Sequence, residues 1–362
     1  MKKLIFGLKI TFLFLIALVA LYIKNCDFLH QIYEAYHYDT FNVFHWQNIR
    51  FTSAEPNKNF VKTKYIIHNP KKFNAFIFGS SRVGNLPIDR LPAELNGKEL
   101  RWYNMTYSEG VPSEHLLSLK TFFEHGVEID MVIVGFDNIS MYASIEQHEA
   151  QLLRMPYQVY EEKPKESRRA YLQMPTDDSI RKQIDEYDES AHKAQKDLFY
   201  NWGGNASDFS LTENPDMSRF VSNHPKQSYT QKNAQDDIAA ITEFCKEHDI
   251  KLILFTNPIY ETTYRDAVED GYFDFLRKVS EKCEFYNFSS LNNFTTDPRY
   301  YFESSHFRPA MGLLVEKMLF GTKEEREQIR AEAGDELWGV KVNAGNVDVV
   351  ISELRKQIDA RE

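Results

Sequence analysis

The sequence predicts an α/β fold in which a parallel sheet is covered by helices on both faces, preceded by one N-terminal transmembrane helix. Short apolar runs alternate with amphipathic helical segments along most of the 362 residues, which is typical of parallel sheets whose strands are buried on both faces. A longer apolar stretch near the start predicts the membrane span. A chain of 362 residues has room for one large domain or two ordinary ones.

Residues 1–24 are expected to form a membrane anchor. Lys2 and Lys3 precede an apolar run from residue 4 to residue 23, and Lys9 is the one charged residue within it. About 20 apolar residues span a bilayer as a helix, and Lys9 lies close enough to one end to snorkel. No small-residue cleavage site follows, which favours an uncleaved signal anchor. The leading charges place the N-terminus in the cytoplasm and the main domain outside, in the periplasm or at the cell surface.

Beyond the anchor we expect a stem, a main domain and a tail. Residues 25–70 are polar and rich in aromatic side chains, which suits a stem that packs on the main domain or lies along the membrane interface. The main domain covers residues 71–320 and contains a largely helical insertion at about 141–230, whose length suits a lid over a site. Residues 321–362 form a charged C-terminal extension.

Strands and helices alternate through the main domain. Short apolar runs predict strands at residues 74–79, 102–105, 130–135, 251–256 and 284–288. Amphipathic spacing, with start and stop residues, predicts helices at residues 113–125, 236–248, 264–282 and 309–320. The extension adds a charged helix at 324–333 and a final helix from residue 347.

Composition excludes several functional classes. The net charge of -10 argues against a general nucleic-acid binder, and the absence of P-loop and GxGxxG motifs leaves nucleotide binding without support. Cys26, Cys245 and Cys283 are too far apart for a zinc knuckle or redox pair, and no histidine set has the spacing of metal ligands. Cys245 falls on the apolar face of a predicted helix, as a buried thiol would. We therefore expect no metal and no cofactor.

The residues with the clearest chemistry lie at the ends of predicted strands. The apolar run at 76–78 leads into Gly79-Ser80-Ser81-Arg82, which presents two serine hydroxyls at the carboxyl edge where parallel sheets build their sites. A serine nucleophile needs a base, and the base needs an orienting group. His306, between the last predicted strand and helix of the domain, is the strongest candidate base. Glu303 can fold back onto its imidazole. The competing interpretation is a surface histidine.

Four further residues are candidates for substrate binding. Arg82 either binds an anionic group or pairs with a surface acid. Asn257 and Tyr260 follow a predicted strand and point to the same edge, although Asn-Pro turn chemistry also explains them. Trp202, in a glycine-rich loop, either stacks on a sugar ring or has a structural role.

Over roughly residues 71–320 these features resemble the SGNH (GDSL-like) hydrolase superfamily, in four blocks and in order. Gly79-Ser80-Ser81 is similar to the Gly-Asp-Ser block, with Ser81 at the nucleophile. Asn104–Gly110 is similar to the second block, whose glycine amide joins the oxyanion hole. Gly135-Phe136-Asp137-Asn138 is similar to Gly-x-Asn-Asp with the last two residues exchanged, and Glu303-Ser304-Ser305-His306 is similar to Asp-x-x-His.

The resemblance implies a three-layer, flavodoxin-like (SGNH hydrolase-like) fold and a Ser81–His306–Glu303 triad that forms an acyl-enzyme. It implies an oxyanion hole at Gly110 and at Asn138 or Asp137, although a carboxylate at 137 would repel the developing oxyanion.

Within the superfamily the chain is most similar to the membrane-anchored branch. This branch includes DltD-like proteins of teichoic-acid alanylation and polysaccharide O-acetyltransferase-like proteins. It implies a serine esterase or O-acyltransferase that acts on a cell-envelope polysaccharide or teichoic-acid-like polymer. Acyl transfer further implies a membrane-bound O-acyltransferase as donor partner. The alternative is a non-catalytic scaffold or binding subunit of an envelope complex, which Ser80 and the exchanged Asp137-Asn138 favour.

Overall fold

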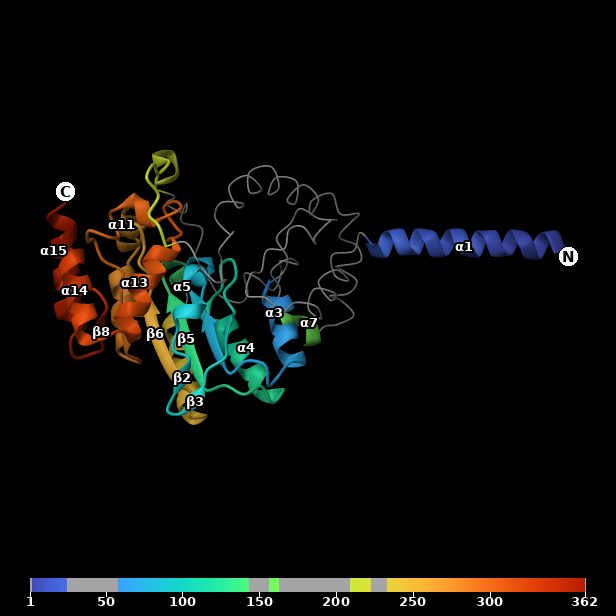
Figure 1. Cartoon of the computed structure of the whole chain (residues 1–362), viewed down its shortest axis with the longest axis horizontal. Coiled ribbons are helices and arrows are strands. Elements are labelled where there is room, and N and C mark those ends of the chain that lie inside the picture. The colour runs from blue at the N-terminus through green and yellow to red at the C-terminus, as the bar shows by residue number, and fades with distance from the viewer. Residues whose placement is uncertain (1, 25–57, 143–155, 163–208, 223–232, 362) are drawn as a thin grey trace.

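A six-stranded sheet forms the centre of the structure, a computed structural model that describes residues 2–24, 58–142, 156–162, 209–222 and 233–361 (Figure 1). The sheet has the spatial order β4 (Trp102–Asn104), β1 (Ala75–Phe78), β5 (Met131–Phe136), β6 (Lys251–Thr256), β7 (Phe285–Asn287), β8 (Val340–Val342). All neighbouring strands pair in parallel except β7 and β8, which are antiparallel. The first five strands therefore lie in a doubly wound order, 2-1-3-4-5 in chain sequence.

Strand side chains alternate between two hydrophobic clusters, one on each face of the sheet. In β1, Phe76 and Phe78 belong to the first cluster, whereas Ala75 and Ile77 belong to the second. Every residue of β1 and of β5 is buried. Burial on both faces explains why these strands occur in the sequence as continuous apolar runs.

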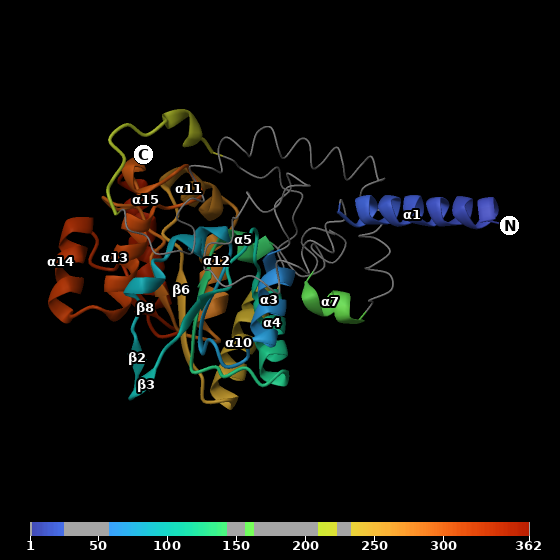
Figure 2. The ribbon, with the colours of Figure 1, turned by 45° about the vertical axis from the view of Figure 1, so that its right-hand side comes forward.

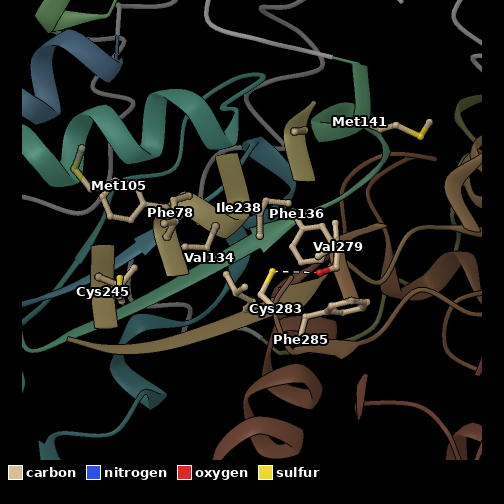
Figure 3. Packing of buried hydrophobic residues seen from close by; sticks show 14 of the residues in the cluster. Phe78, Met105, Val134, Phe136, Met141, Ile238, Cys245, Val279, Cys283 and Phe285 are labelled. Carbon is tan, nitrogen blue, oxygen red and sulfur yellow. Dashed lines mark hydrogen bonds between the residues drawn. The ribbon is translucent and has the colours of Figure 1, made fainter. Parts of the chain in front are cut away.

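Among the helices on the first face of the sheet are α4 (Pro112–Glu124), α10 (Ala234–Glu247), α12 (Tyr272–Ser280) and α15 (Val347–Asp359). Figure 3 shows Val134 and Phe136 of the sheet beside Ile238 of α10 and Val279 of α12. Cys245 is buried in this cluster, as predicted, and burial raises the pKa of its thiol to about 12.

The second face carries α13 (Pro309–Phe320) and α14 (Lys323–Ala333), which lie opposite α4 and α10 in Figure 2. Gly312 of α13 packs closely on the turn after β1, because a Cβ at this position would lie 2.5 Å from the Asn85 carbonyl oxygen. The predicted α/β class, with a mostly parallel sheet and helices, is confirmed.

Residues 321–361 complete the domain rather than extending from it. β8 extends the sheet at β7, and the fully buried Trp338 packs against the rings of Phe288 and Phe294. The main domain also begins before residue 71, since Phe60 and Ile66 of α3 (Lys58–His68) are fully buried in the first cluster. α3 carries charged side chains among its buried ones, so the sequence did not identify it as part of the domain.

The predicted helix at 264–282 is two helices, α11 (Glu261–Glu269) and α12. Gly271 separates them with a φ of 95°, a left-handed conformation that favours glycine. Amphipathic spacing continues across this break, so the hydrophobic pattern does not reveal it.

Helix α1 (Lys2–Lys24) occupies the predicted anchor. Over the described residues, no helix combines the length and apolar character that a membrane span requires, so the structure gives the predicted span no support. The described parts of the predicted insertion are the end of α5 (Asn138–Tyr142), residues 156–162 with α7 (Tyr157–Glu162), and residues 209–222, which include the short η4 (Met217–Arg219). The rest of the insertion, and the stem from 25 to 57, lie outside the described residues.

Glu316 of α13 should make stability fall as pH rises. Its carboxyl group is buried, and neither oxygen has a hydrogen-bond partner among the described residues. Burial and the charge of Asp89 raise its pKa to about 9, despite an opposing effect of Arg90. Because the folded state then holds a proton that the unfolded state releases above about 4.5, stability should fall by up to about 1.4 kcal/mol per pH unit between these values.

Thermal unfolding across this pH range provides the measurement. Glu316→Gln keeps the shape without the ionisable group, so it should flatten the slope and raise the melting temperature above neutral pH. The exposed Glu336→Gln variant should retain the wild-type slope. Equal slopes for wild type and Glu316→Gln would contradict the assignment.

Candidate active site

A glycine turn at the carboxyl end of β1 presents Ser81. Gly79 has a φ of 153°, and a Cβ there would lie 2.4 Å from Val83 Cγ2. Only glycine can therefore connect β1 to the short helix η1 (Ser81–Asn85) in this way. Ser80 caps η1 by accepting a hydrogen bond from the Arg82 N–H. The buried Ser80 thus belongs to the turn, whereas Ser81 is partly exposed.

Ser81, His306 and Glu303 form a continuous hydrogen-bonded array. Ser81 Oγ lies 2.8 Å from His306 Nε2, although the two residues are 225 positions apart in the chain. His306 Nδ1 lies 2.5 Å from Glu303 Oε1. Both distances are within the reach required for proton transfer and for orienting the imidazole. The structure therefore brings together the three residues predicted as catalytic.

A small hairpin holds the base and its carboxylate. Tyr301 and Phe307 form an antiparallel bridge, and the Phe302 N–H donates to the His306 carbonyl. Inside this loop, Glu303 accepts hydrogen bonds from the backbone N–H groups of Ser305, at 2.8 Å, and His306, at 2.7 Å. The carboxylate is therefore fixed by the backbone as well as by the imidazole.

The Glu303 carboxylate is held in its ionised form. Burial alone would raise its pKa, but hydrogen bonds from His306 and the Ser305 N–H, together with the charges of His306 and Arg82, outweigh burial. The net result is a pKa below the ordinary glutamate value. An ionised carboxylate at this position can stabilise the imidazolium that forms when His306 accepts a proton.

Arg82 is buried beneath the site rather than open to a ligand. Its Nη1 atom lies 3.4 Å from Asp137 Oδ1 and donates to Asn138 Oδ1 at 2.5 Å. Its Nη2 atom donates to Ser305 Oγ at 3.1 Å. Arg82 is only 5% exposed, so it neither binds a substrate anion nor pairs with a surface acid, which were the two predictions.

Asp137 is surrounded by hydrogen-bond donors, as an ionised carboxylate requires and an oxyanion donor would not. It accepts hydrogen bonds from Ser80 Oγ at 3.2 Å, Asn257 Nδ2 at 2.8 Å and the Ile139 N–H at 2.8 Å. The side chain is fully buried. Asp137 thus links Ser80, Asn257 and Arg82. The prediction that it belongs to the oxyanion hole is not supported.

Gly110 and Asn257 are also engaged within the protein. The Gly110 N–H donates to the Tyr107 carbonyl at 3.2 Å, and a Cβ on Gly110 would lie 2.6 Å from the Gly79 carbonyl oxygen. Gly110 therefore allows close packing behind the nucleophile turn, and its amide is already engaged. Asn257 is buried as a donor to Asp137. Trp202 lies outside the described residues.

Tyr260 contributes to a support for the His306 loop that the sequence did not reveal. Residues 209–222, here called the strap, run along this loop. The Arg219 carbonyl accepts a hydrogen bond from the Ser304 N–H at 3.2 Å. The ring of Phe220 lies 4.8 Å from that of Tyr260, and Phe220 is buried. No motif in the sequence identifies the strap, because its contacts come from scattered groups: the backbone of Thr212 and Arg219, the Ser222 hydroxyl, and the rings of Phe209 and Phe220.

A scan of protein-family models gives no match to this chain, and a search of curated proteins finds no similar sequence. In the part of the chain that the structure describes, no three His, Cys, Asp or Glu side chains gather as a metal site.

Phe220→Ala should loosen the His306 loop. Truncating a buried phenylalanine costs about 3–5 kcal/mol, and here the loss falls on a local contact between the strap and Tyr260. Hydrogen exchange at the Ser304 amide should become about 10²-fold faster, measured on the full chain. Val221 is the neighbouring residue and is 55% exposed, so Val221→Ala should leave the exchange rate of the Ser304 amide unchanged. Unaltered exchange in Phe220→Ala would show that the strap does not support the loop.

Proposed function

We propose that the protein is a serine esterase or O-acyltransferase that works through an acyl-enzyme on Ser81. The observation that carries the proposal is the array in which Ser81 Oγ is 2.8 Å from His306 Nε2 and His306 Nδ1 meets Glu303. A serine, a base and an orienting carboxylate in this order are the parts of a nucleophilic triad. Their position at the carboxyl edge of a parallel sheet agrees with the usual place of such sites.

In the first half-reaction, Ser81 Oγ bonds to the acyl carbon while His306 Nε2 takes the hydroxyl proton. The tetrahedral intermediate then expels the alcohol of the donor ester, which receives that proton from His306. Glu303 holds the Nδ1 proton by hydrogen bond throughout and stabilises the transient imidazolium. The products are an ester on Ser81 and a free alcohol.

In the second half-reaction, His306 takes a proton from the attacking hydroxyl group. Water as the attacking group gives a free acid, and a sugar or polyol hydroxyl gives a new ester. Ser81 leaves with the proton returned by His306. Exclusion of water from the site decides between hydrolysis and transfer.

The proposed substrate class and the proposed location outside the membrane are supported by sequence motifs. The four blocks resemble the SGNH superfamily and its membrane-anchored branch, which supports an acyl ester on an envelope polysaccharide or teichoic-acid-like polymer. The apolar run at 4–23 supports a cytoplasmic N-terminus with the domain outside the membrane. In the transferase version, a membrane-bound O-acyltransferase delivers the acyl group.

One observation favours the alternative, a non-catalytic scaffold or binding subunit of an envelope complex. Of the three residues expected to form the oxyanion hole, Gly110 already donates its amide to Tyr107, and Asp137 is an acceptor engaged by other donors. Asn138 is the remaining side-chain candidate. Covalent labelling of Ser81 distinguishes the two functions, because a scaffold needs no activated serine.

The full-length chain should react with a fluorophosphonate probe and hydrolyse a small acetyl ester. Ser81→Ala should abolish labelling, because it removes the nucleophile. His306→Ala should slow labelling and hydrolysis by about 10³-fold, because general-base assistance is lost. Ser304→Ala, a buried serine of the same loop, is the control for the loop itself and should still be labelled. Wild-type protein that is neither labelled nor active would favour the scaffold.

Glu303→Gln should lower kcat/KM for the acetyl ester by about 10³- to 10⁴-fold, because a neutral amide cannot stabilise the imidazolium. The lowered pKa also links Glu303 to stability. The ionised folded form is favoured above the unfolded value of about 4.5, so this stabilisation should be lost as pH falls through the folded pKa.

Melting temperatures at neutral and acid pH measure this second effect. The acid-induced decrease should be smaller in Glu303→Gln than in wild type, whereas Glu336→Gln should behave as wild type. An unchanged kcat/KM in Glu303→Gln would remove Glu303 from the mechanism.

A further inference from the structure

We infer that Arg82 is a positioning residue that orients Asn138 as the oxyanion donor and ties the His306 loop to the nucleophile turn. The inference rests on the proposed acyl-transfer function and deepens it. It starts from the observation that one buried guanidinium contacts both Asn138 and Ser305.

Arg82 determines which end of the Asn138 carboxamide faces it. A guanidinium has donors and no acceptor, so it can bond only the oxygen of the amide. The Nη1–Oδ1 contact has this polarity. The Asn138 NH₂ group is consequently turned away from Arg82 and remains a donor. The opposite rotamer would place NH₂ against a cation.

Asp137 holds Arg82 in that orientation. The two side chains are 6% and 1% exposed, and Nη1 lies 3.4 Å from Oδ1. Ser80, Asn257 and the Ile139 N–H fix the carboxylate in turn. Because the guanidinium is planar and its donors form a rigid fork, fixing its Nη1 side also fixes the direction of Nη2.

The second contact of Arg82 is with the loop that carries the base, His306. Arg82 Nη2 donates to Ser305 Oγ, and the Ser305 N–H donates to Glu303. Ser305 lies immediately before His306 in the chain. Arg82 itself follows Ser81. One side chain therefore connects the nucleophile turn, the start of α5 and the His306 loop.

This arrangement predicts an effect on the transition state rather than on binding. Negative charge on the acyl oxygen develops only as Ser81 attacks, so a donor fixed in advance acts mainly on kcat. Loss of one oxyanion donor typically lowers kcat about 10²- to 10³-fold. Because Arg82 acts through Asn138, loss of Arg82 should lower kcat by nearly the same factor.

A double-mutant cycle on the full chain tests the inference, with kcat and KM for an acetyl ester and the rate of fluorophosphonate labelling as readouts. Asn138→Ala and Arg82→Met should each lower kcat about 10²-fold with little change in KM. The double variant should be no slower than about the slower single variant. Arg82→Lys, which keeps the charge but not the fork, should recover part of the rate.

Arg90→Met is the matched control, since Arg90 is an exposed arginine in η2 (Ile88–Arg90), and it should keep wild-type rates. If Arg82→Met does not fold, the same cycle is run with Arg82→Lys. Losses that multiply in the double variant, or an Arg82 variant with normal kcat, overturn the inference while the triad stands. A wild-type chain without labelling or turnover overturns the proposed function and, with it, the role of Arg82.

Discussion

The buried pair formed by Arg82 and Asp137 is the interaction on which the rest of the site depends. Taking two charges out of water is costly unless they are paired and their remaining hydrogen-bonding capacity is used. Here Asp137 accepts from Ser80, Asn257 and the Ile139 N–H, besides facing Arg82. The pair joins the end of β1 to the end of β5, so the nucleophile turn is anchored to the neighbouring strand. Removing either partner would leave an uncompensated charge beneath the catalytic serine.

The departures from the expected motifs are related through this pair. The resemblance expects an acid before the nucleophile, where this chain has Ser80, and asparagine followed by aspartate after β5, where it has the reverse. In the structure Ser80 Oγ donates to Asp137. One carboxylate therefore still lies beside the turn, but it comes from β5 instead of β1. The amide that the motif places at 137 is found one residue later, at the start of α5.

Patterns that depend on neighbouring residues could be predicted from the sequence, and contacts across the fold could not. Strands such as β5 are buried on both faces and leave a continuous apolar run. Ser81, His306 and Glu303 were identifiable because each lies at an expected sheet edge with suitable chemistry. The role of Arg82 depends on residues about 56 and 223 positions away, which no local pattern encodes. β8 (Val340–Val342) was missed because an exposed lysine, Lys341, interrupts it, so it is not a continuous apolar run.

The short edge strands limit how this protein can associate with others. β4 at one edge and β8 at the other have three residues each, and Lys341 at the centre of β8 pairs with Glu284. Long, flat edge strands are templates for pairing with another chain, whereas short edges with a charged side chain resist it. Aggregation by strand addition is therefore disfavoured. The loops at the carboxyl ends of the strands, which carry Ser81 and His306, are not part of either edge.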